Sequence, residues 1–171
     1  HREENISSER NFKNLIDSLN QLAVKFKHPI IVSTHPRTRN KLNELSLETD
    51  PLIQFLEPLG FIDYNALQKN AFVVLSDSGT ISEESSILNF RALNIREAHE
   101  RPEGMEEAAV MMVGLDSENI LRGVSEVQSQ LVGGERNFNI VSDYSKANVS
   151  SKVVRIILSY TSYINRVVWQ K

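Results

Sequence analysis

The sequence predicts an α/β fold, a doubly wound Rossmann-like parallel sheet with helices on both faces. Two observations lead to this class. Short apolar runs of about five residues alternate with segments of helical periodicity along the chain. Within these runs polar and apolar residues do not alternate, which is typical of parallel strands buried on both faces.

The chain opens with a helix and a first strand. Apolar side chains recur at helical spacing over residues 12–26, and Ser7 or Ser8 is the expected N-cap. Residues 29–33 form an apolar run of the buried-strand type. Pro36 suits the first turn of the polar helix that follows.

The second and third strands follow in the same rhythm. Residues 52–56 predict a strand that ends before Pro58, and Asp63 is the expected cap of a short helix toward Lys69. Residues 71–75 predict the third strand. A helix through Leu88 and strands over 91–95 and 109–113 are expected next. Asp116 is the expected cap of a further helix, whose apolar positions run to Leu131 and which ends at Gly133-Gly134. The last expected element is a long helix from Val149 to Ile164.

Composition restricts the class of protein. The chain has 171 residues, 40% of them hydrophobic, and a formal net charge of −3, which argues against a nucleic-acid-binding domain. It contains no Cys, which excludes disulfides, thiolate metal sites and a Cys nucleophile. No segment approaches the roughly 20 apolar residues of a membrane helix, and no signal-peptide pattern opens the chain. We therefore expect a soluble, cytoplasmic domain with no metal, no cofactor and no membrane partner.

The sharpest candidate site is the segment 76–84, Ser-Asp-Ser-Gly-Thr-Ile-Ser-Glu-Glu. Ligands of open α/β sheets bind outside the carboxyl ends of the strands. Here a strand end, Gly79 and a helix N-terminus coincide, and free backbone N–H groups there favour a phosphate. Ser78 can add a hydroxyl, and Glu83 or Glu84 could hold a sugar diol. The same residues also suit plain helix capping, so both interpretations stay open.

Three further segments end predicted strands. Residues 96–107 concentrate charge in a predicted loop, which is either a solvated loop or an anion clamp beside the phosphate site. His35 precedes Pro36 after the first strand, and its role is either structural or catalytic. Tyr64 either stacks on a base or packs the start of its helix.

Together these residues resemble the non-hydrolysing UDP-N-acetylglucosamine 2-epimerase family. The resemblance covers the whole chain and is carried by four motifs that occur in the family's order: His1-Arg-Glu-Glu-Asn5, Thr34-His35, Ser76-Asp-Ser-Gly79 with Glu83-Glu84, and Glu100-Arg-Pro-Glu103. The chain is similar to the C-terminal half of these enzymes. Gly79-Thr-Ile-Ser-Glu-Glu and Asp143-Tyr-Ser are closest to the capsule and O-antigen branch that forms UDP-N-acetyl-L-fucosamine.

The resemblance implies a GT-B-type enzyme of two Rossmann-like domains, in which residues 1–171 form a single UDP-binding domain. It assigns the diphosphate to Ser78 and Gly79, the ribose to Glu84 and the uracil to Tyr64. Arg101, His35 and His1 would be the catalytic or cleft residues. The family usually has a second glycine after Gly79, where this chain has Thr80.

The implied reaction is elimination of UDP across C1–C2 of a UDP-N-acetyl-hexosamine, followed by re-addition with inverted C2 configuration. The family's proton-transferring carboxylates lie in an N-terminal domain that these residues lack, so we expect them to be inactive alone and to bind UDP weakly. We also expect a homo-oligomer to be possible, and the first strand to be missing from the middle of the sheet. Residues 30–33 would then pair elsewhere, or a partner chain would fill the gap.

Two alternatives remain from the sequence. A GT-B glycosyltransferase would share the UDP site but would also need an acceptor site. A non-catalytic module that senses a UDP-sugar would need neither an acceptor nor a second domain.

Overall fold

The computed structural model describes residues 7–98 and 100–171. Its contacts divide the chain into two compact units, one extending to Val141 and the other spanning Ser142–Lys171. All the strands of the described residues lie in the first unit, so the candidate site is built there. That residues 1–171 act as one UDP-binding domain stays a prediction.

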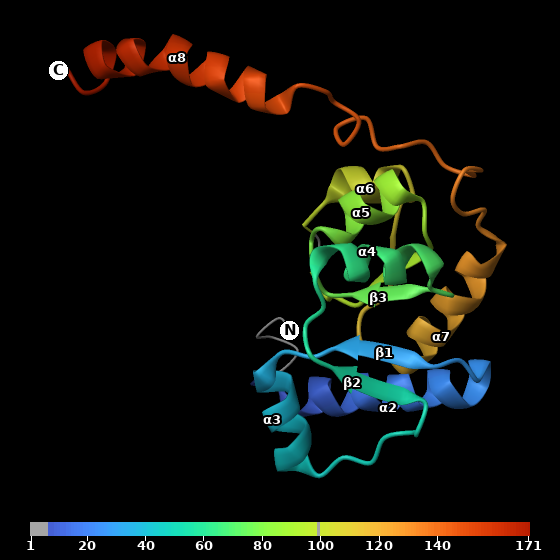
Figure 1. Ribbon diagram of the computed structural model, residues 1–171. Coiled ribbons are helices and arrows are strands. Elements are labelled where there is room, and N and C mark those ends of the chain that lie inside the picture. The colour runs from blue at the N-terminus through green and yellow to red at the C-terminus, as the bar shows by residue number, and fades with distance from the viewer. Residues whose placement is uncertain (1–6, 99) are drawn as a thin grey trace. The chain divides into compact units, whose positions relative to one another are not determined.

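The first unit alternates helices and strands as expected (Figure 1). All five predicted strands are confirmed, with ends that differ from the prediction by up to three residues. In chain order the elements are α2 (Glu9–Phe26), β1 (Ile30–Ser33), α3 (Pro36–Leu45), β2 (Ile53–Leu56), α4 (Phe61–Asn70), β3 (Val74–Ser76), α5 (Ile81–Leu88), β4 (Ala92–Asn94), α6 (Pro102–Glu106), β5 (Met111–Met112), α7 (Ser117–Glu126) and a 3-10 turn (Val127–Ser129).

Every strand pair is parallel, which confirms the fold class, but the described strands form two sheets. β1 pairs with β2, with Ile30 opposite Ile53, and β4 lies between β3 and β5. The predicted single sheet is therefore present as two sheets among the described residues, and β1 and β3 are their facing strands (Figure 1). The expectation that residues 30–33 pair elsewhere is wrong, because β1 keeps its parallel partner β2 and the break lies on its other side.

Helices cover both faces of the three-stranded sheet. Leu93 packs into a large core with residues of α2, β2 and α7, whereas its neighbour Ala92 packs into a second core with Ile81 and Phe90. Successive strand residues point to opposite faces, so β4 joins two separate cores. This double burial explains why the strand sequences are continuously apolar.

Several predicted helix ends are confirmed. Ser8 accepts a hydrogen bond from the N–H of Asn11 at the start of α2, and Asp116 does the same for Asn119 at α7. Asp63 is not the cap of α4, because that helix begins after Gly60 and Asp63 lies in its first turn. The helix predicted to continue to Leu131 ends at Glu126 and gives way to the 3-10 turn.

The second unit consists of a loop and the predicted last helix, α8 (Val149–Val167). Val149, Val153, Ile156, Ile157 and Tyr160 lie on one face of α8, whereas Val154 and Leu158 lie on the opposite face, and none of the helix's residues is buried. Among the helices of the described residues, none is long and apolar enough to cross a membrane.

Candidate functional site

The turn between β3 and α5 lies at the carboxyl end of the three-stranded sheet, where the sequence places the phosphate site. Hydroxyl groups organise this turn. Ser76 Oγ accepts the N–H of Ser78 at 3.1 Å, and Ser78 Oγ accepts the N–H of Thr80 at 3.3 Å. Ser78 and Thr80 hydroxyls also lie 3.0 Å apart. Thr80, which stands where the family that the sequence resembles usually has a second glycine, is therefore part of the hydroxyl network of the turn.

Hydrogen bonds to residues 133–136 hold the C-terminal end of α5, the end opposite the turn. Asn89 ends the helix with a left-handed backbone (φ 54°) and donates to the carbonyls of Gly133 and Glu135. Arg136 donates to the carbonyl oxygens of Ser86 and Ile87 at 2.6 and 2.7 Å. The two bonds from Arg136 satisfy carbonyl groups that the C-terminus of α5 leaves without partners within the helix.

Tyr64 of α4 and Glu84 of α5 come together through Gln68. The Gln68 side chain is 3% exposed, and its Nε2 donates to Glu84 Oε2 at 2.6 Å. Burial raises the pKa of the Tyr64 phenol above its ordinary value of 10.0, and the nearby charges of Glu84 and Asp77 raise it further. Two residues that the sequence assigns to the nucleotide thus share one cluster.

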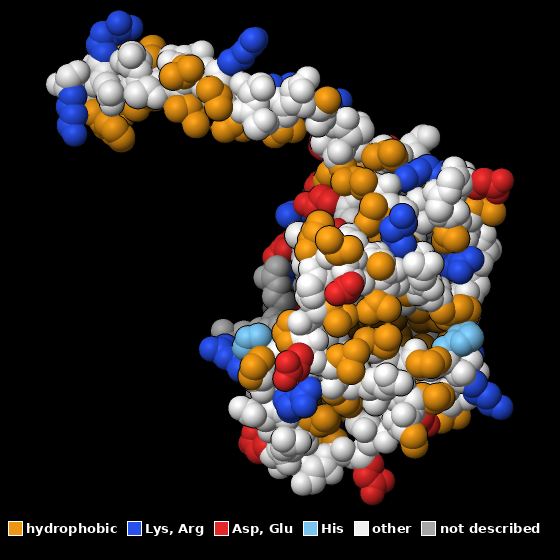
Figure 2. Space-filling view, viewed as in Figure 1, with side chains coloured by type: hydrophobic (Ala, Val, Ile, Leu, Met, Phe, Trp, Pro, Cys, Tyr) orange, Lys and Arg blue, Asp and Glu red, His pale blue; other side chains and the backbone are white. Residues whose placement is uncertain are grey.

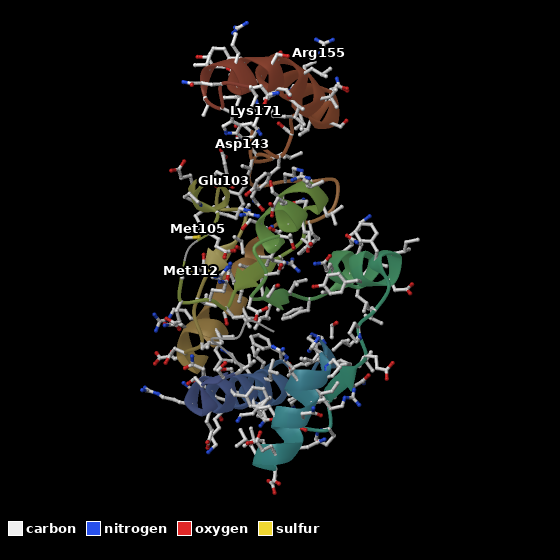
Figure 3. All side chains as sticks on the ribbon, turned by 90° about the vertical axis from the view of Figure 1, so that its left-hand side faces the viewer. Glu103, Met105, Met112, Asp143, Arg155 and Lys171 are labelled. Atoms are coloured by element: carbon white, nitrogen blue, oxygen red, sulfur yellow. The ribbon has the colours of Figure 1, made fainter. Side chains whose placement is uncertain are left out.

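The charged segment 96–107 is not a plain loop, because Pro102–Glu106 forms α6. Figure 3 labels Glu103 and Met105 of this helix, on the same side of the molecule as Met112 of β5. Arg101 precedes α6 and its Nε donates to Glu83 Oε1 of α5 at 2.9 Å. The sequence-predicted Arg101 therefore lies beside the turn, held by a glutamate of the neighbouring helix.

Glu100 lies against the Gly79 backbone. A Cβ atom added to Gly79 would stand 2.7 Å from Glu100 Oε2 and 3.7 Å from an Arg101 nitrogen. The same Glu100 oxygen lies 2.6 Å from Nη1 of Arg96, which is 5% exposed. Only glycine fits here while Arg96 holds Glu100 in place.

The space between these groups is small. Residues of α5, β4 and α6 line a cavity of about 10 Å³, about room for one water molecule. Gln68 Oε1, Glu83 Oε2 and Asn94 Oδ1 are buried acceptors without a partner among the described residues. Buried acceptors normally find donors, and ligand hydroxyls or water supply them.

His35 lies at the carboxyl end of β1, in the two-stranded sheet, and caps α3. Its Nδ1 accepts the N–H of Arg37 at 3.3 Å, so the structural role considered for His35 is present. His1 lies outside the described residues. Within residues 7–98 and 100–171, no group of three or more His, Asp or Glu side chains is placed to hold a metal ion.

Sequence reasoning missed two residues of this cluster, Gln68 and Asp77. Gln68 lies four residues after Tyr64, on the same helix face, and that spacing was the available signal. The sequence identifies Asp77 only as part of the turn, because its effect on the pKa of Tyr64 depends on how α4 approaches β3.

Comparisons with known proteins point to one family of enzymes. A family model described as UDP-N-acetylglucosamine 2-epimerase matches residues 1–158. The UDP-N-acetylglucosamine 2-epimerase of Methanococcus maripaludis is 34% identical over 161 residues, which are 92% of this chain and 42% of that protein.

Two solved structures have a fold similar to that of the chain. The UDP-N-acetylglucosamine 2-epimerase of Rickettsia bellii is 45% identical with a TM-score of 0.88, and the match covers 100% of this chain and 45% of that one. The Methanocaldococcus jannaschii enzyme in complex with UDP-GlcNAc and UDP is 29% identical with a TM-score of 0.82, covering 93% of this chain and 43% of that one. The chain thus spans less than half the length of these relatives.

Proposed function

The chain belongs to the UDP-N-acetylglucosamine 2-epimerase family, and we propose that it is the UDP-binding half of an enzyme that epimerises a UDP-N-acetyl-hexosamine at C2. The observation that carries the proposal is the Tyr64–Gln68–Glu84 cluster beside the Ser76–Glu84 turn. A family relative in complex with UDP-GlcNAc and UDP supports the ligand class.

In this proposal the diphosphate lies at Ser78 and Gly79, where a helix N-terminus and a glycine allow close approach of an anion. Glu84 accepts hydrogen bonds from the ribose hydroxyls, and Tyr64 contacts the uracil. Arg101 turns from Glu83 to the phosphates, because a diphosphate offers more negative charge in a bidentate geometry. The buried acceptors at Gln68 and Glu83 suit donors such as sugar hydroxyls.

The proposed reaction needs no redox step. A base removes the C2 proton, the C1–O bond breaks with its electrons passing to UDP, and a C1–C2 double bond forms. UDP then adds back to C1 while a proton returns to the opposite face of C2. Arg101 and the α5 N-terminus stabilise the charge that develops on departing UDP. His35 and His1 are proposed to line the cleft, and the proton-transferring carboxylates to belong to the other half of the enzyme.

The proposal includes that other half as a partner, association into a homo-oligomer, a cytoplasmic location and a role in surface-polysaccharide precursors, all carried over from the resemblance. The branch that forms UDP-N-acetyl-L-fucosamine is the proposed substrate group, supported by Gly79-Thr-Ile-Ser-Glu-Glu and Asp143-Tyr-Ser. These 171 residues alone should bind UDP without epimerising it, because a single wall neither excludes water nor positions the C2 proton against a base.

The test is calorimetric titration of UDP into the chain and its Glu84→Ala variant. Loss of a charge-assisted hydrogen bond should weaken binding by roughly 1.5–3 kcal/mol, or about 10- to 150-fold. Glu44→Ala, which removes an exposed carboxylate of α3 paired with Lys41, is the matched control and should leave affinity unchanged. Equal affinities of the wild type and Glu84→Ala would remove Glu84 from the site.

Activity is measured separately in D₂O without an acceptor, both with UDP-GlcNAc and with the 6-deoxy UDP-N-acetyl-hexosamine that is the precursor of UDP-N-acetyl-L-fucosamine. The chain joined to the N-terminal half of the enzyme should catalyse incorporation of deuterium at C2 of the sugar, whereas the chain alone should not. A requirement for an acceptor would instead indicate a glycosyltransferase. No turnover by the joined protein would favour the sensing module, and turnover by the chain alone would contradict the need for two walls.

A further inference from the structure

We propose that Gln68 is a positioning residue that holds the Glu84 carboxylate toward the ribose, so that the site selects ribonucleoside diphosphate sugars over 2′-deoxy ones. This inference rests on the proposed function, from which it takes the contact between Glu84 and the ribose hydroxyls. Three features of α4 and α5 support it: the burial of an amide on α4, the contacts of that amide, and the different partners of two adjacent glutamates on α5.

Gln68 is buried in a helix whose apolar side chains are exposed. Phe61 and Ile62 of α4 are 83% and 80% exposed, Leu67 is exposed as well, and Figure 2 shows hydrophobic side chains over this helix. Gln68 is the one residue of α4 that is buried. This pattern is the reverse of an ordinary amphipathic helix. An apolar side chain of similar size would be buried at lower cost than an amide, so packing alone does not explain Gln68.

The amide nitrogen of Gln68 contacts the two residues proposed to bind the nucleoside. Its Nε2 donates to Glu84 Oε2 at 2.6 Å. Burial raises the pKa of the Tyr64 phenol and the charges of Glu84 and Asp77 raise it further, whereas the side-chain hydrogen bond with Gln68 lowers it. A hydrogen bond that lowers the pKa of a phenol is one donated to the phenol oxygen. The two hydrogens of an amide nitrogen are enough for both contacts.

The orientation of the amide is determined by its partner. If the amide were turned over, Gln68 Oε1 would face Glu84 Oε2, and two acceptors at 2.6 Å would repel each other. Oε1 is instead buried without a partner among the described residues, a cost that only a ligand or water donor removes. The amide therefore leaves its own acceptor unsatisfied while its nitrogen holds the carboxylate.

The adjacent glutamates of α5 are held by different partners. Arg101 Nε donates to Glu83 Oε1 at 2.9 Å, which pairs two opposite charges. Glu84 is held by the neutral amide of Gln68, so its charge is not neutralised there, and no hydrogen bond within residues 7–98 and 100–171 occupies its Oε1. An ionised carboxylate accepts at both oxygens and binds hydroxyl donors more strongly than a neutral acceptor does. Glu84 is thus oriented and still available to two hydroxyls.

A carboxylate held in one orientation distinguishes ribose from 2′-deoxyribose. The 2′- and 3′-hydroxyls of a ribose can donate together to one carboxylate, whereas 2′-deoxyribose offers only one of these donors. A glutamate that rotates freely loses rotamer entropy when it binds, and Gln68 removes that freedom before the ligand arrives. The share of the affinity that depends on the 2′-hydroxyl should therefore depend on Gln68, whereas the share from the uracil and the diphosphate should not.

The test is calorimetric titration of UDP and 2′-deoxy-UDP into the complete chain. The two nucleotides share the uracil and the diphosphate, so the ratio of their affinities isolates the contribution of the 2′-hydroxyl. Gln68→Met keeps the unbranched shape of the side chain but removes both donors. Gln21→Met is the matched control, because Gln21 Nε2 makes the same 2.6 Å contact with a carboxylate, that of Asp17 on α2.

The wild type and Gln21→Met should bind UDP about tenfold or more tightly than 2′-deoxy-UDP, the contribution of one hydrogen bond to a charged group. Gln68→Met should lower this ratio by about threefold or more, as expected when one immobilised side chain regains its rotamers. Glu84→Ala should remove the preference altogether. If Gln68→Met weakened both nucleotides equally and kept the ratio, Gln68 would have only a packing role and the proposal would be overturned.

Failure of the proposed function gives a different result. If the wild type did not bind UDP, or if Glu84→Ala bound both nucleotides as the wild type does, the nucleotide site itself would be wrong and this inference with it. If Glu84→Ala removed the preference while Gln68→Met retained it, only the role of Gln68 would be overturned.

A second measurement on the wild type does not depend on the folding of Gln68→Met. The side-chain amide signals of Gln68 are followed by ¹H–¹⁵N NMR during the same two titrations. UDP should shift these signals further than 2′-deoxy-UDP at equal saturation, because the bond from Nε2 to Glu84 responds to the second hydroxyl. Equal shifts with the two nucleotides would overturn the proposal.

Discussion

Replacement of Gly79 by Ala tests the close contact between the turn and the 96–107 segment. Gly79 does not have a left-handed backbone, so the substitution carries no conformational penalty and its effect is steric. The new methyl group would stand 2.7 Å from Glu100 Oε2, whereas ordinary contact begins at 3.4 Å. Glu100 must therefore retreat by about 0.7 Å.

The cost follows from what holds Glu100. Its carboxylate lies 2.6 Å from the guanidinium of Arg96, and a shift of this size stretches that pair beyond ordinary hydrogen-bond length. Glu100 is 35% exposed, so water screens part of the interaction. We expect a loss of about 1 kcal/mol in the free energy of unfolding, or about 2–4 °C in Tm. The methyl group also narrows the proposed diphosphate site, and UDP should bind about tenfold more weakly.

Thermal unfolding and UDP titration measure the two effects. Gly60→Ala is the matched control, because its nearest neighbour would be Asp63 Oδ2 at an unstrained 3.8 Å. Glu100→Asp withdraws the carboxylate by one methylene, so Gly79→Ala should cost less in that background. If Gly79→Ala cost as much in the Glu100→Asp variant as in the wild type, or no more than Gly60→Ala, the contact would be refuted as the cause.

Three other outcomes are expected. Folding raises the pKa of Tyr64, so the protonated phenol stabilises the folded state fully below pH 10, and this stabilisation is lost as the pH rises through the folded-state pKa. Tyr64→Phe should therefore remove this part of the fall in unfolding free energy at alkaline pH, as measured by chemical denaturation. Arg101→Lys keeps the charge but loses the planar fork and the Nε donor to Glu83, so UDP affinity measured by calorimetry should fall about tenfold. Deletion of residues 145–171 should change the Tm of the first unit by less than about 1 °C in calorimetry, since α8 buries none of its own side chains.

The sequence predicts the strands and most helix caps because those depend on local patterns. A polar residue before a helical apolar pattern predicts Asp116 as one cap and Ser7 or Ser8 as another, and the structure shows Asp116 and Ser8 accepting the expected hydrogen bonds. Asp63 has the same composition signal but lies inside the first turn of α4, because the chain already turns at Gly60. Such differences of two or three residues depend on how the chain packs beyond the local window.

The site was predictable to the extent that strand ends determine it. Parallel strands bring Gly79 and Arg101 to one edge, and this holds whichever side chains they contact. The pairing of Arg101 with Glu83 and the burial of Gln68 could not be predicted, since both depend on the relative positions of α4, α5 and α6. The sequence predicts a missing strand in the sheet, but its patterns do not determine whether β1 keeps its parallel partner β2.

The most direct measurement of the central claim is a two-dimensional ¹H–¹⁵N NMR titration of the chain with UDP. Binding at the turn predicts that the amide signals of Ser78, Gly79 and Thr80 shift first and furthest, together with those of Tyr64 and Glu84. Inorganic phosphate at equal charge should move the turn signals but not that of Tyr64. Shifts confined to residues outside 64–101, or no shifts at millimolar UDP, would contradict the proposal that this turn holds the nucleotide.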